Sequence, residues 1–405
     1  MNIQSRSSNS FTSKRIVVLG AGPYQVDTLK SLAKAGFYIL ALDRNGKSPG
    51  FAYAHNSEVV DIKDKVEVYR ASLKFKADGI MPLNDFGTRS AYYTAQRLNL
   101  PGSSYLTGIC TNDKFLMRQI WDHDNLPQPN YSCFSDLETL KGCNLTFPSV
   151  MKPSDSGGGS RGVSLIWNME DLENAWVKAK PYAMSQRYII EEFIDGIECT
   201  IESIVYSGKV FNLAISDKEI DPNTACVSKS INFMADLPEI VIKQVYEVVT
   251  NAIESLGIIN GAVHTEVIVS RDLTKVSLIE TASRGGGGHI FSKIIEEVTG
   301  VDAPIQLGKI VCGLKPDLEP KRKSFCTYRF LESTKVGKIK SISVDESVHD
   351  LENLIEFKIN AKVGQEINGL NNDHDRLGFI ITKGKNREAA IETAKKIDTM
   401  INIVI

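Results

Sequence analysis

The spacing of apolar and polar segments in the first quarter of the chain predicts strands that alternate with helices. Helical stretches extend to about residue 35 and over about residues 87–98. The apolar runs typical of short buried strands lie at residues 14–20, 37–43, 57–62 and 78–83. Strands alternating with helices form a parallel sheet covered on both faces. A PGSS turn that begins at Pro101 is expected to close this α/β unit.

The middle and end of the chain have a different pattern, typical of an α+β arrangement. Predicted helices cover about residues 112–125, with Thr111 as the N-cap, and about 169–180, 237–256 and 387–400. Between them lie short β-rich runs, two of which are joined by SGK at residues 207–209 and predict a hairpin. Two further strands are expected at residues 262–269 and 276–281, and the chain becomes β-rich again from about residue 321.

Length and composition describe an ordinary globular protein. A chain of 405 residues predicts two or three domains. The net charge of −2 argues against a nucleic-acid partner, and no apolar run is long enough to span a bilayer. The polar residues 1–13 predict a disordered tail without a secretory signal. Seven scattered cysteines with no C-x-x-C pair favour reduced thiols and a cytoplasmic location.

A lysine followed by a glycine loop is the first candidate for phosphate binding. Lys152 ends the apolar run FPSVMK, and SDSGGGSRG follows at residues 154–162. Backbone N–H groups of such a loop can approach phosphate oxygens because glycine has no side chain to block them. The loop residues expected to do so are Ser156, Gly157, Gly158 and Gly159. A mobile surface loop is the alternative, but a lysine at the end of a buried strand needs an anionic partner.

The segment IIEEFIDGIE offers a place for a nucleobase and a ribose. Backbone groups from Glu192 to Ile194 can read a base edge, and Glu198 can accept hydrogen bonds from ribose hydroxyls. An edge strand with solvated acids is the alternative.

Two glutamates in neighbouring strand-like runs suggest a magnesium site. Glu266 lies in HTEVIV and Glu280 in SLIETA, and antiparallel pairing would bring them together. Facing carboxylates repel, so without a cation the apparent pKa of the pair is expected to rise. Oxygen-only ligands suit Mg²⁺. His264 would share the face of Glu266, either at the substrate or as a core histidine, and Arg284 could stabilise an acyl phosphate or hold a carboxylate.

A second glycine signal supports a rival interpretation. Gly20 to Gln25 follow a strand and precede a helix, and Asp43 ends the next strand, which partly imitates a dinucleotide fingerprint. Gln25 stands where the third glycine is expected. Anion binding at a helix N-terminus is an equally physical use. A nicotinamide-dependent oxidoreductase would leave the series from Lys152 to Arg284 without a role.

In their order along the chain, these motifs resemble the ATP-grasp superfamily, and most of all its carboxylate–amine ligases, which include the L-amino acid ligases. The carboxylase ATPase of phosphoribosylaminoimidazole and biotin carboxylase are similar at a greater distance. The residues that the resemblance assigns to ATP are Lys114 in TNDKFLMRQ, Lys152, the flap from Ser156 to Arg161, the hinge Glu191, Glu192, Phe193 and Ile194, Glu198, and Lys218. It assigns magnesium to Glu266 and Glu280, and catalysis to Arg284 and to His264, which lies in the same strand as Glu266.

The resemblance implies three parts: a Rossmann-like pre-ATP-grasp domain at 14–110, an ATP-grasp domain at 111–318 with a small mobile subdomain at about 130–196, and a β-rich C-terminal subdomain at 319–405. Ala282 stands where many relatives have asparagine, which removes a third metal ligand. The implied reaction uses ATP and Mg²⁺ to convert a carboxylate to an acyl phosphate, which an amine then attacks. Both substrates are small molecules. A bicarbonate-using carboxylase and a non-catalytic nucleotide sensor are alternatives, and a homodimer is one oligomeric arrangement left open.

Overall fold

A four-stranded parallel sheet forms the N-terminal part of the computed structural model, which describes residues 14–220 and 227–405. The predicted tail at residues 1–13 lies outside the described residues. The strand order is β3-β2-β1-β4. The strands are β1 (Arg15–Leu19), β2 (Tyr38–Asp43), β3 (Asn56–Val59) and β4 (Gly79–Pro82). This confirms the parallel sheet predicted from the alternating pattern.

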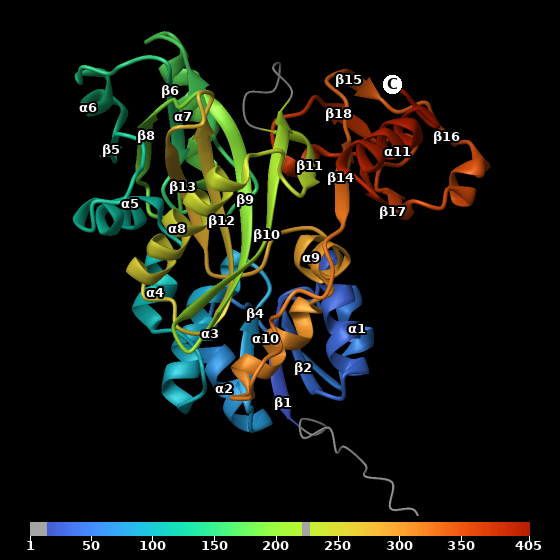
Figure 1. Cartoon of the computed structure of the whole chain (residues 1–405). Helices are drawn as coiled ribbons and strands as arrows, with labels where there is room; N and C mark the ends of the chain where they lie inside the picture. The colour runs from blue at the N-terminus through green and yellow to red at the C-terminus, as the bar shows by residue number, and fades with distance from the viewer. Residues whose placement is uncertain (1–13, 221–226) are drawn as a thin grey trace, which may run out of the picture.

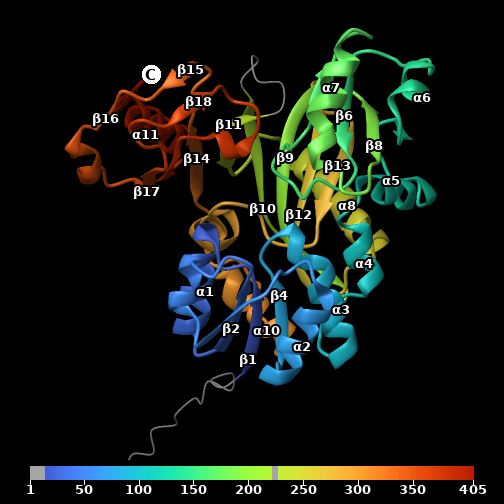
Figure 2. The ribbon, with the colours of Figure 1, turned by 180° about the vertical axis from the view of Figure 1, so that it is seen from behind.

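Helices cover both faces of this sheet, as predicted, but one of them comes from far along the chain. Side chains of β1 alternate between two cores: Ile16 packs toward α1, and Val17 packs toward α2 and α3. The covering helices are α1 (Val26–Lys34), α2 (Lys65–Phe75), α3 (Asp85–Leu98) and α10 (Ala303–Val311). Figures 1 and 2 show α10 beside β1 and α1, and Leu307 is buried in the same core as Leu29.

The centre of the molecule is an eight-stranded sheet in the order β13-β12-β9-β10-β11-β14-β19-β17. Neighbouring strands are antiparallel, and the predicted turn at 207–209 joins β9 to β10 as a hairpin. The strands are β9 (Gly196–Tyr206), β10 (Lys209–Ile220), β11 (Ser228–Phe233), β12 (Gly261–Ser270), β13 (Val276–Ala282), β14 (Phe325–Leu331), β17 (Leu354–Ile359) and β19 (Gly378–Gly384). The helix α8 (Glu239–Ser255) packs one apolar face, which includes Val245 and Val249, against this sheet.

A smaller antiparallel sheet with its own core lies beside the large one. Its order is β5-β8-β6-β7, and α7 covers it through Leu172 and Ala175. Its elements are β5 (Tyr131–Phe134), α6 (Leu137–Lys141), β6 (Ser149–Pro153), β7 (Ser164–Ile166), α7 (Asp171–Ala179) and β8 (Tyr188–Glu192). In Figures 1 and 2 this small subdomain and the C-terminal segments stand on opposite sides of β9 and β10.

The C-terminal segments continue the large sheet. The strand β14 pairs with both β11 and β19. Backbone hydrogen bonds therefore join the predicted C-terminal subdomain, residues 319–405, to the part of the chain before it. The helix α11 (Arg387–Thr399) packs behind β19 and β14. Two short antiparallel pairs complete this part: β15 (Val336–Lys338) with β18 (Glu366–Asn368), and β16 (Ser341–Val344) with β20 (Ile401–Val404).

Several helices depart from the predicted pattern. The predicted helix after Thr111 begins later, as α5 (Lys114–His123), and its N-cap is Asp113, whose carboxylate accepts from the N–H groups of Phe115 and Leu116. Thr111 instead ends α4 (Tyr105–Cys110). The pattern did not predict α2, α4, α6, α10 or α9 (Ile295–Thr299). Short amphipathic helices of this kind draw much of their stability from tertiary packing, which periodicity alone does not reveal.

Candidate active site

A cavity of about 480 Å³ lies between the small sheet and the large sheet. It gathers residues from β6, β8, β9, β10, β12 and β13 and from the glycine loop. The predicted site residues that line it are Lys114, Lys152, Ser156, Gly158, Gly159, Glu191, Glu192, Phe193, Ile194, Glu198, Lys218, His264, Glu266, Glu280 and Arg284. Gly157 lines an adjoining cavity instead. Segments far apart in sequence therefore converge as their order along the chain suggested.

Glu191 is the anionic partner of Lys152. Lys152 donates from Nζ to Oε2 of Glu191 at 2.6 Å, and Arg118 donates from Nε to Oε1 at 2.8 Å. Burial opposes ionisation of Glu191, but the charges of Arg118 and Lys152 outweigh it and lower the pKa of Glu191 to about 2. The Glu191 carboxylate thus positions Lys152 at the cavity wall, and the hinge residues Phe193 and Ile194 follow directly after β8.

Glu266 and Glu280 are directly opposite one another on β12 and β13. Opposed residues of antiparallel strands project from the same face of a sheet, and both line the cavity. Each carboxylate has its own lysine: Lys114 Nζ lies 2.8 Å from Glu280 Oε1, and Lys218 Nζ lies 2.7 Å from Glu266 Oε1. Lys218 also pairs with Glu198.

These lysines overturn one expectation. Mutual repulsion was expected to raise the pKa of the glutamate pair, but the pKa of Glu266 is held well below its usual value. Burial favours the neutral acid, yet Lys218 and the hydrogen bond from His264 outweigh it. The sequence placed the two carboxylates correctly and missed that lysines from other elements would neutralise them.

His264 and Arg284 are each fixed by a carboxylate that the sequence did not single out. His264 Nδ1 lies 2.5 Å from Glu202 Oε1, and although burial favours the neutral ring, Glu202 raises the pKa of His264 to about 9. Arg284 donates from Nε and Nη2 to the two oxygens of Asp85 at 3.0 and 3.1 Å. Asp85 begins α3 just beyond β4, and an acid at the carboxyl end of a parallel strand is the signal that could have found it.

A second cavity of about 420 Å³ adjoins the first. The two share the flap glycines Gly158 and Gly159, the charged side chains Lys218, Glu266 and Arg284, and three further residues, Ser228, His264 and Asp373. Its wall also includes Tyr24 and Gln25 from the first glycine turn, Asp85, and aromatic rings of the C-terminal segments. A molecule in either cavity would therefore approach the same catalytic candidates.

Asp43 ties the first glycine turn to the loop after β2. Both carboxylate oxygens of Asp43 accept from backbone N–H groups, of Ala21 at 2.8 Å and of Asn45 at 2.9 Å. The turn lines the second cavity through Tyr24 and Gln25.

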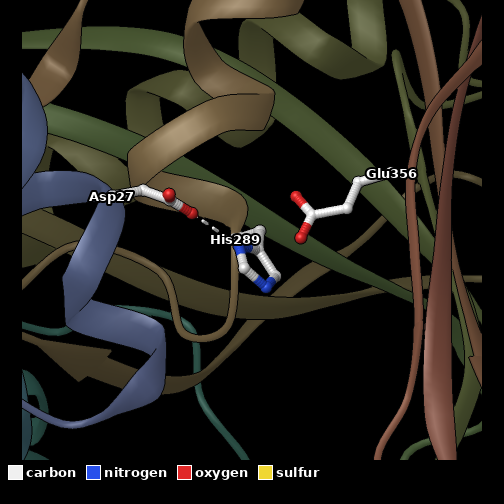
Figure 3. A group of neighbouring side chains, drawn as sticks. All are labelled: Asp27, His289 and Glu356. Carbon is white, nitrogen blue, oxygen red and sulfur yellow. Dashed lines mark ion pairs between the residues drawn. The ribbon is translucent and has the colours of Figure 1, made fainter. Parts of the chain in front are cut away.

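A group outside both cavities has ligand atoms close enough for a metal, yet contains its own cation. Asp27, His289 and Glu356 converge from three parts of the chain (Figure 3), with one ligand atom of each within 4.8 Å of the others. Lys293 Nζ lies 3.2 Å from Asp27 Oδ2 and also pairs with Glu356. The lysine pairs with both acids, so the group is an ion-pair junction between α1, the π-helical segment at residues 290–294 and β17.

The arrangement of a small sheet, a glycine flap and a large sheet around one charged cavity is that of an ATP-grasp fold. Comparison with known families agrees: residues 145–293 match the ATP-grasp domain, and residues 329–405 match the L-amino acid ligase C-terminal domain 2. The chain therefore contains an ATP-grasp domain, and its relatives are ligases of the ATP-grasp superfamily.

The sequence identity of three curated relatives to this chain lies between 25% and 29% over the aligned residues. The formate-dependent phosphoribosylglycinamide formyltransferase of Methanocella arvoryzae is 29% identical over 47% of this chain and 46% of its own length. The corresponding enzyme of Methanocaldococcus jannaschii is 28% identical over 70% of this chain and 73% of its own length. Alanine–anticapsin ligase of Bacillus subtilis is 25% identical over 64% of this chain and 59% of its own length. The chain thus spans about half the length of several of the curated relatives it matches.

Solved structures confirm the fold over nearly the whole chain. The L-amino acid ligase of Bacillus licheniformis has a TM-score of 0.82 at 22% identity, covering 96% of this chain and 98% of that one. The phosphoribosylglycinamide synthetase of Anaerococcus prevotii has a TM-score of 0.76 at 22% identity, covering 97% and 100%.

Proposed function

We propose that the protein is an ATP-dependent ligase that activates a carboxylate as an acyl phosphate and couples it to an amine, with ADP and phosphate as the other products. The observation that carries the proposal is the set of lysine–glutamate pairs along one cavity wall, together with Arg284 at the junction with a second cavity. The first cavity suits the nucleotide, and the second suits the carboxylate and the amine. Relatives whose names describe ligation support the same reaction class.

Magnesium fits the two opposed glutamates. Glu266 and Glu280 offer only oxygen ligands on one face, and Ala282 adds none. Both carboxylates already stabilise a positive charge, that of Lys218 or Lys114. When bound, a magnesium ion would neutralise charge on the phosphate oxygens. We infer that the lysines then exchange their glutamate partners for phosphate oxygens.

The chain's own residues have three tasks in this proposal. Lys114, Lys152 and Lys218 bind the phosphates as fixed charges, and the backbone of Glu192 to Ile194 with Glu198 binds the nucleoside. Arg284, oriented by Asp85, stabilises the phosphoryl group during transfer and the acyl phosphate afterwards. The flap excludes water while the amine nitrogen attacks the acyl carbon and phosphate leaves.

The test combines product analysis with a substrate screen. Protein, ATP and magnesium are incubated with pooled carboxylates and amines, and nucleotides and new amides are identified by chromatography and mass spectrometry. We expect ADP, phosphate and one amide in equal amounts. Stoichiometric AMP would contradict the acyl-phosphate route. A carboxylated product that requires bicarbonate would favour the carboxylase alternative.

No membrane-spanning candidate occurs among the helices of residues 14–220 and 227–405, because none combines the length and apolarity that a bilayer requires. A cytoplasmic location and a homodimer stay predictions.

A further inference from the structure

The glycine flap, Ser156 to Arg161, contacts residues from other parts of the molecule. Gly157, Gly158 and Gly159 all have positive φ, between +74° and +78°. A Cβ added at Gly157 would lie 2.7 Å from the ring of Phe86, and one at Gly158 would lie 2.9 Å from Asp85. The run of glycines is therefore needed because the flap backbone lies directly against the start of α3.

Arg161, just after these glycines, bridges the N-terminal and C-terminal parts. Its guanidinium carbon stands 5.4 Å from the ring centroid of Phe86, a cation–π contact. Its Nε and Nη2 lie 3.2 and 2.7 Å from Nε2 of His374, which belongs to the C-terminal segment after β18. A Cβ at Gly159 would also lie only 3.5 Å from that nitrogen.

The hydrogen bonds from Arg161 require a neutral His374. Guanidinium groups only donate, so Nε2 of His374 accepts and its proton is on Nδ1. The surroundings favour this state, since burial and the charge of Arg161 lower the pKa of His374 while Asp373 and Asp375 oppose the shift. Arg376 also lowers the pKa of His374.

From this geometry we propose that Arg161 and His374 form a latch, which fastens the closed flap to the C-terminal segment over the junction of the two cavities. His374 acts as a positioning residue through Arg161. Both residues line the second cavity, and the flap glycines border both cavities. The latch rests on the proposed function for its purpose: a closed flap keeps water from the acyl phosphate.

The reaction that the latch suppresses is hydrolysis. Water would attack the acyl carbon, the bond from that carbon to the phosphate oxygen would break, and the products would be the original carboxylate, inorganic phosphate and a proton. While the flap is open, the enzyme would therefore convert ATP to ADP and phosphate without forming an amide. Loss of the latch should lower the ratio of amide to ADP.

Hydrogen exchange measures the latch without relying on catalysis. Exchange of residues 154–162 is followed in full-length protein with ADP and magnesium for wild type, His374→Ala, His374→Gln and Arg161→Met. Glutamine's side-chain oxygen can accept from Arg161, so His374→Gln should retain protection, whereas the other two variants should exchange roughly two- to tenfold faster, the range of one net hydrogen bond. The control is His349→Ala, an exposed histidine of the same C-terminal part.

A double variant separates the latch from a general loss of stability. If His374 acts only through Arg161, Arg161→Met with His374→Ala should exchange no faster than Arg161→Met alone. Exchange in β9 and β10 shows whether a variant is folded. If His374→Ala does not fold, Arg161→Met takes its place in the comparison with wild type. Equal flap exchange in wild type and in folded His374→Ala, or failure of glutamine to restore protection, overturns the latch.

The amide-to-ADP ratio is then measured with pooled L-amino acids as carboxylates and amines. A lower ratio in His374→Ala than in wild type supports the protective role, and an unchanged ratio overturns that role. A wild-type protein without turnover contradicts the proposed function, while the exchange data still decide whether the latch exists.

Discussion

At the scale of single residues, the cavity wall is a set of paired charges. Lys114, Lys152 and Lys218 each pair with a glutamate. An unpaired buried charge is costly, and these carboxylates stabilise the three lysines. Under the proposed function, ATP binding exchanges one anionic partner of each lysine for another.

Lys152→Ala should weaken ATP binding while leaving the protein folded. A charge-assisted hydrogen bond is worth about 1.5–3 kcal/mol, which is roughly a tenfold to hundredfold loss of affinity. Glu191 would keep Arg118, so the loss of stability should stay below the roughly 3–5 kcal/mol of a fully unpaired buried charge. Calorimetric titration with magnesium and ATP, alongside urea unfolding, measures both. Lys178→Ala, on the exposed face of α7, is the control, and an unchanged affinity for Lys152→Ala would count against the assignment.

His264 should make stability depend on pH above neutrality. Its pKa is about 9 in the folded chain and 6.5 as a free side chain, so its contribution is fully present below pH 6.5 and is lost as pH rises through 9. The loss is at most about 3 kcal/mol. Urea unfolding from pH 6 to 10 of wild type and His264→Gln gives the difference directly. A constant difference across this range would show that Glu202 does not hold His264 protonated.

At the scale of elements, the pairing register of two strands and the path of one loop define the site. The register of β12 and β13 sets Glu266 against Glu280, and a shift by one residue would turn one of them to the opposite face. The flap, by contrast, is shaped by close contacts with α3.

Glu280→Gln should abolish turnover and leave the fold intact. The amide oxygen can still accept from Lys114, so the cavity wall keeps its hydrogen bond, but the neutral side chain is a poorer magnesium ligand. Turnover is followed as ADP release at increasing magnesium concentrations, and folding by thermal unfolding. Glu247→Gln, an exposed glutamate on α8, is the matched control. Turnover at the wild-type rate would contradict the assignment of Glu280 to the proposed metal site.

Gly157→Ala should displace the flap and weaken nucleotide binding. The substitution places a methyl group 2.7 Å from Phe86 and forces alanine to a φ of +74°. Gly208→Ala is the matched control, because it has the same strain at φ +79° but nothing within 4 Å of its Cβ. Each variant should lose about 1–2 kcal/mol of folding stability, because alanine is strained in the left-handed backbone conformation. Only Gly157→Ala should also lose affinity for ATP in calorimetry, and equal affinities would contradict flap contact with α3.

At the scale of the whole molecule, the parts share sheets and cores. The large sheet continues into the C-terminal segments through β11 and β14, and α10 returns to cover the N-terminal sheet. The junction of Lys293 with Asp27 and Glu356 joins three parts at one point. Their relative placement is thereby fixed around the second cavity.

Lys293→Met should destabilise the folded protein by about 1.5–3 kcal/mol, the range for hydrogen bonds to charged groups, because Asp27 and Glu356 lose their shared cation. Urea unfolding measures the loss, with Lys243→Met, an exposed lysine on α8, as the control. Zinc or magnesium should not stabilise the wild-type junction, since the lysine is already its cation. Metal-dependent stabilisation of wild type that is lost in His289→Ala would contradict this interpretation.

The sequence by itself determined what local chemistry can specify. Periodicity predicted the parallel N-terminal sheet and the β9–β10 hairpin, because strand length and turn residues are local properties. The order of lysine, glycine loop, hinge and carboxylates, together with the resemblance to ATP-grasp ligases, predicted about half of the residues that line the cavity. The assignment of those residues to ATP and magnesium stays a prediction.

Only the tertiary structure decided which residues become partners across the chain. It paired Lys152 with Glu191, Arg284 with Asp85 and Lys218 with Glu266, over separations that no periodic pattern encodes. It also returned α10 to the first sheet and laid the flap against α3. The physical reason is that burial and charge pairing act between elements once they pack, so the pKa of Glu266 falls although two neighbouring carboxylates alone would raise it.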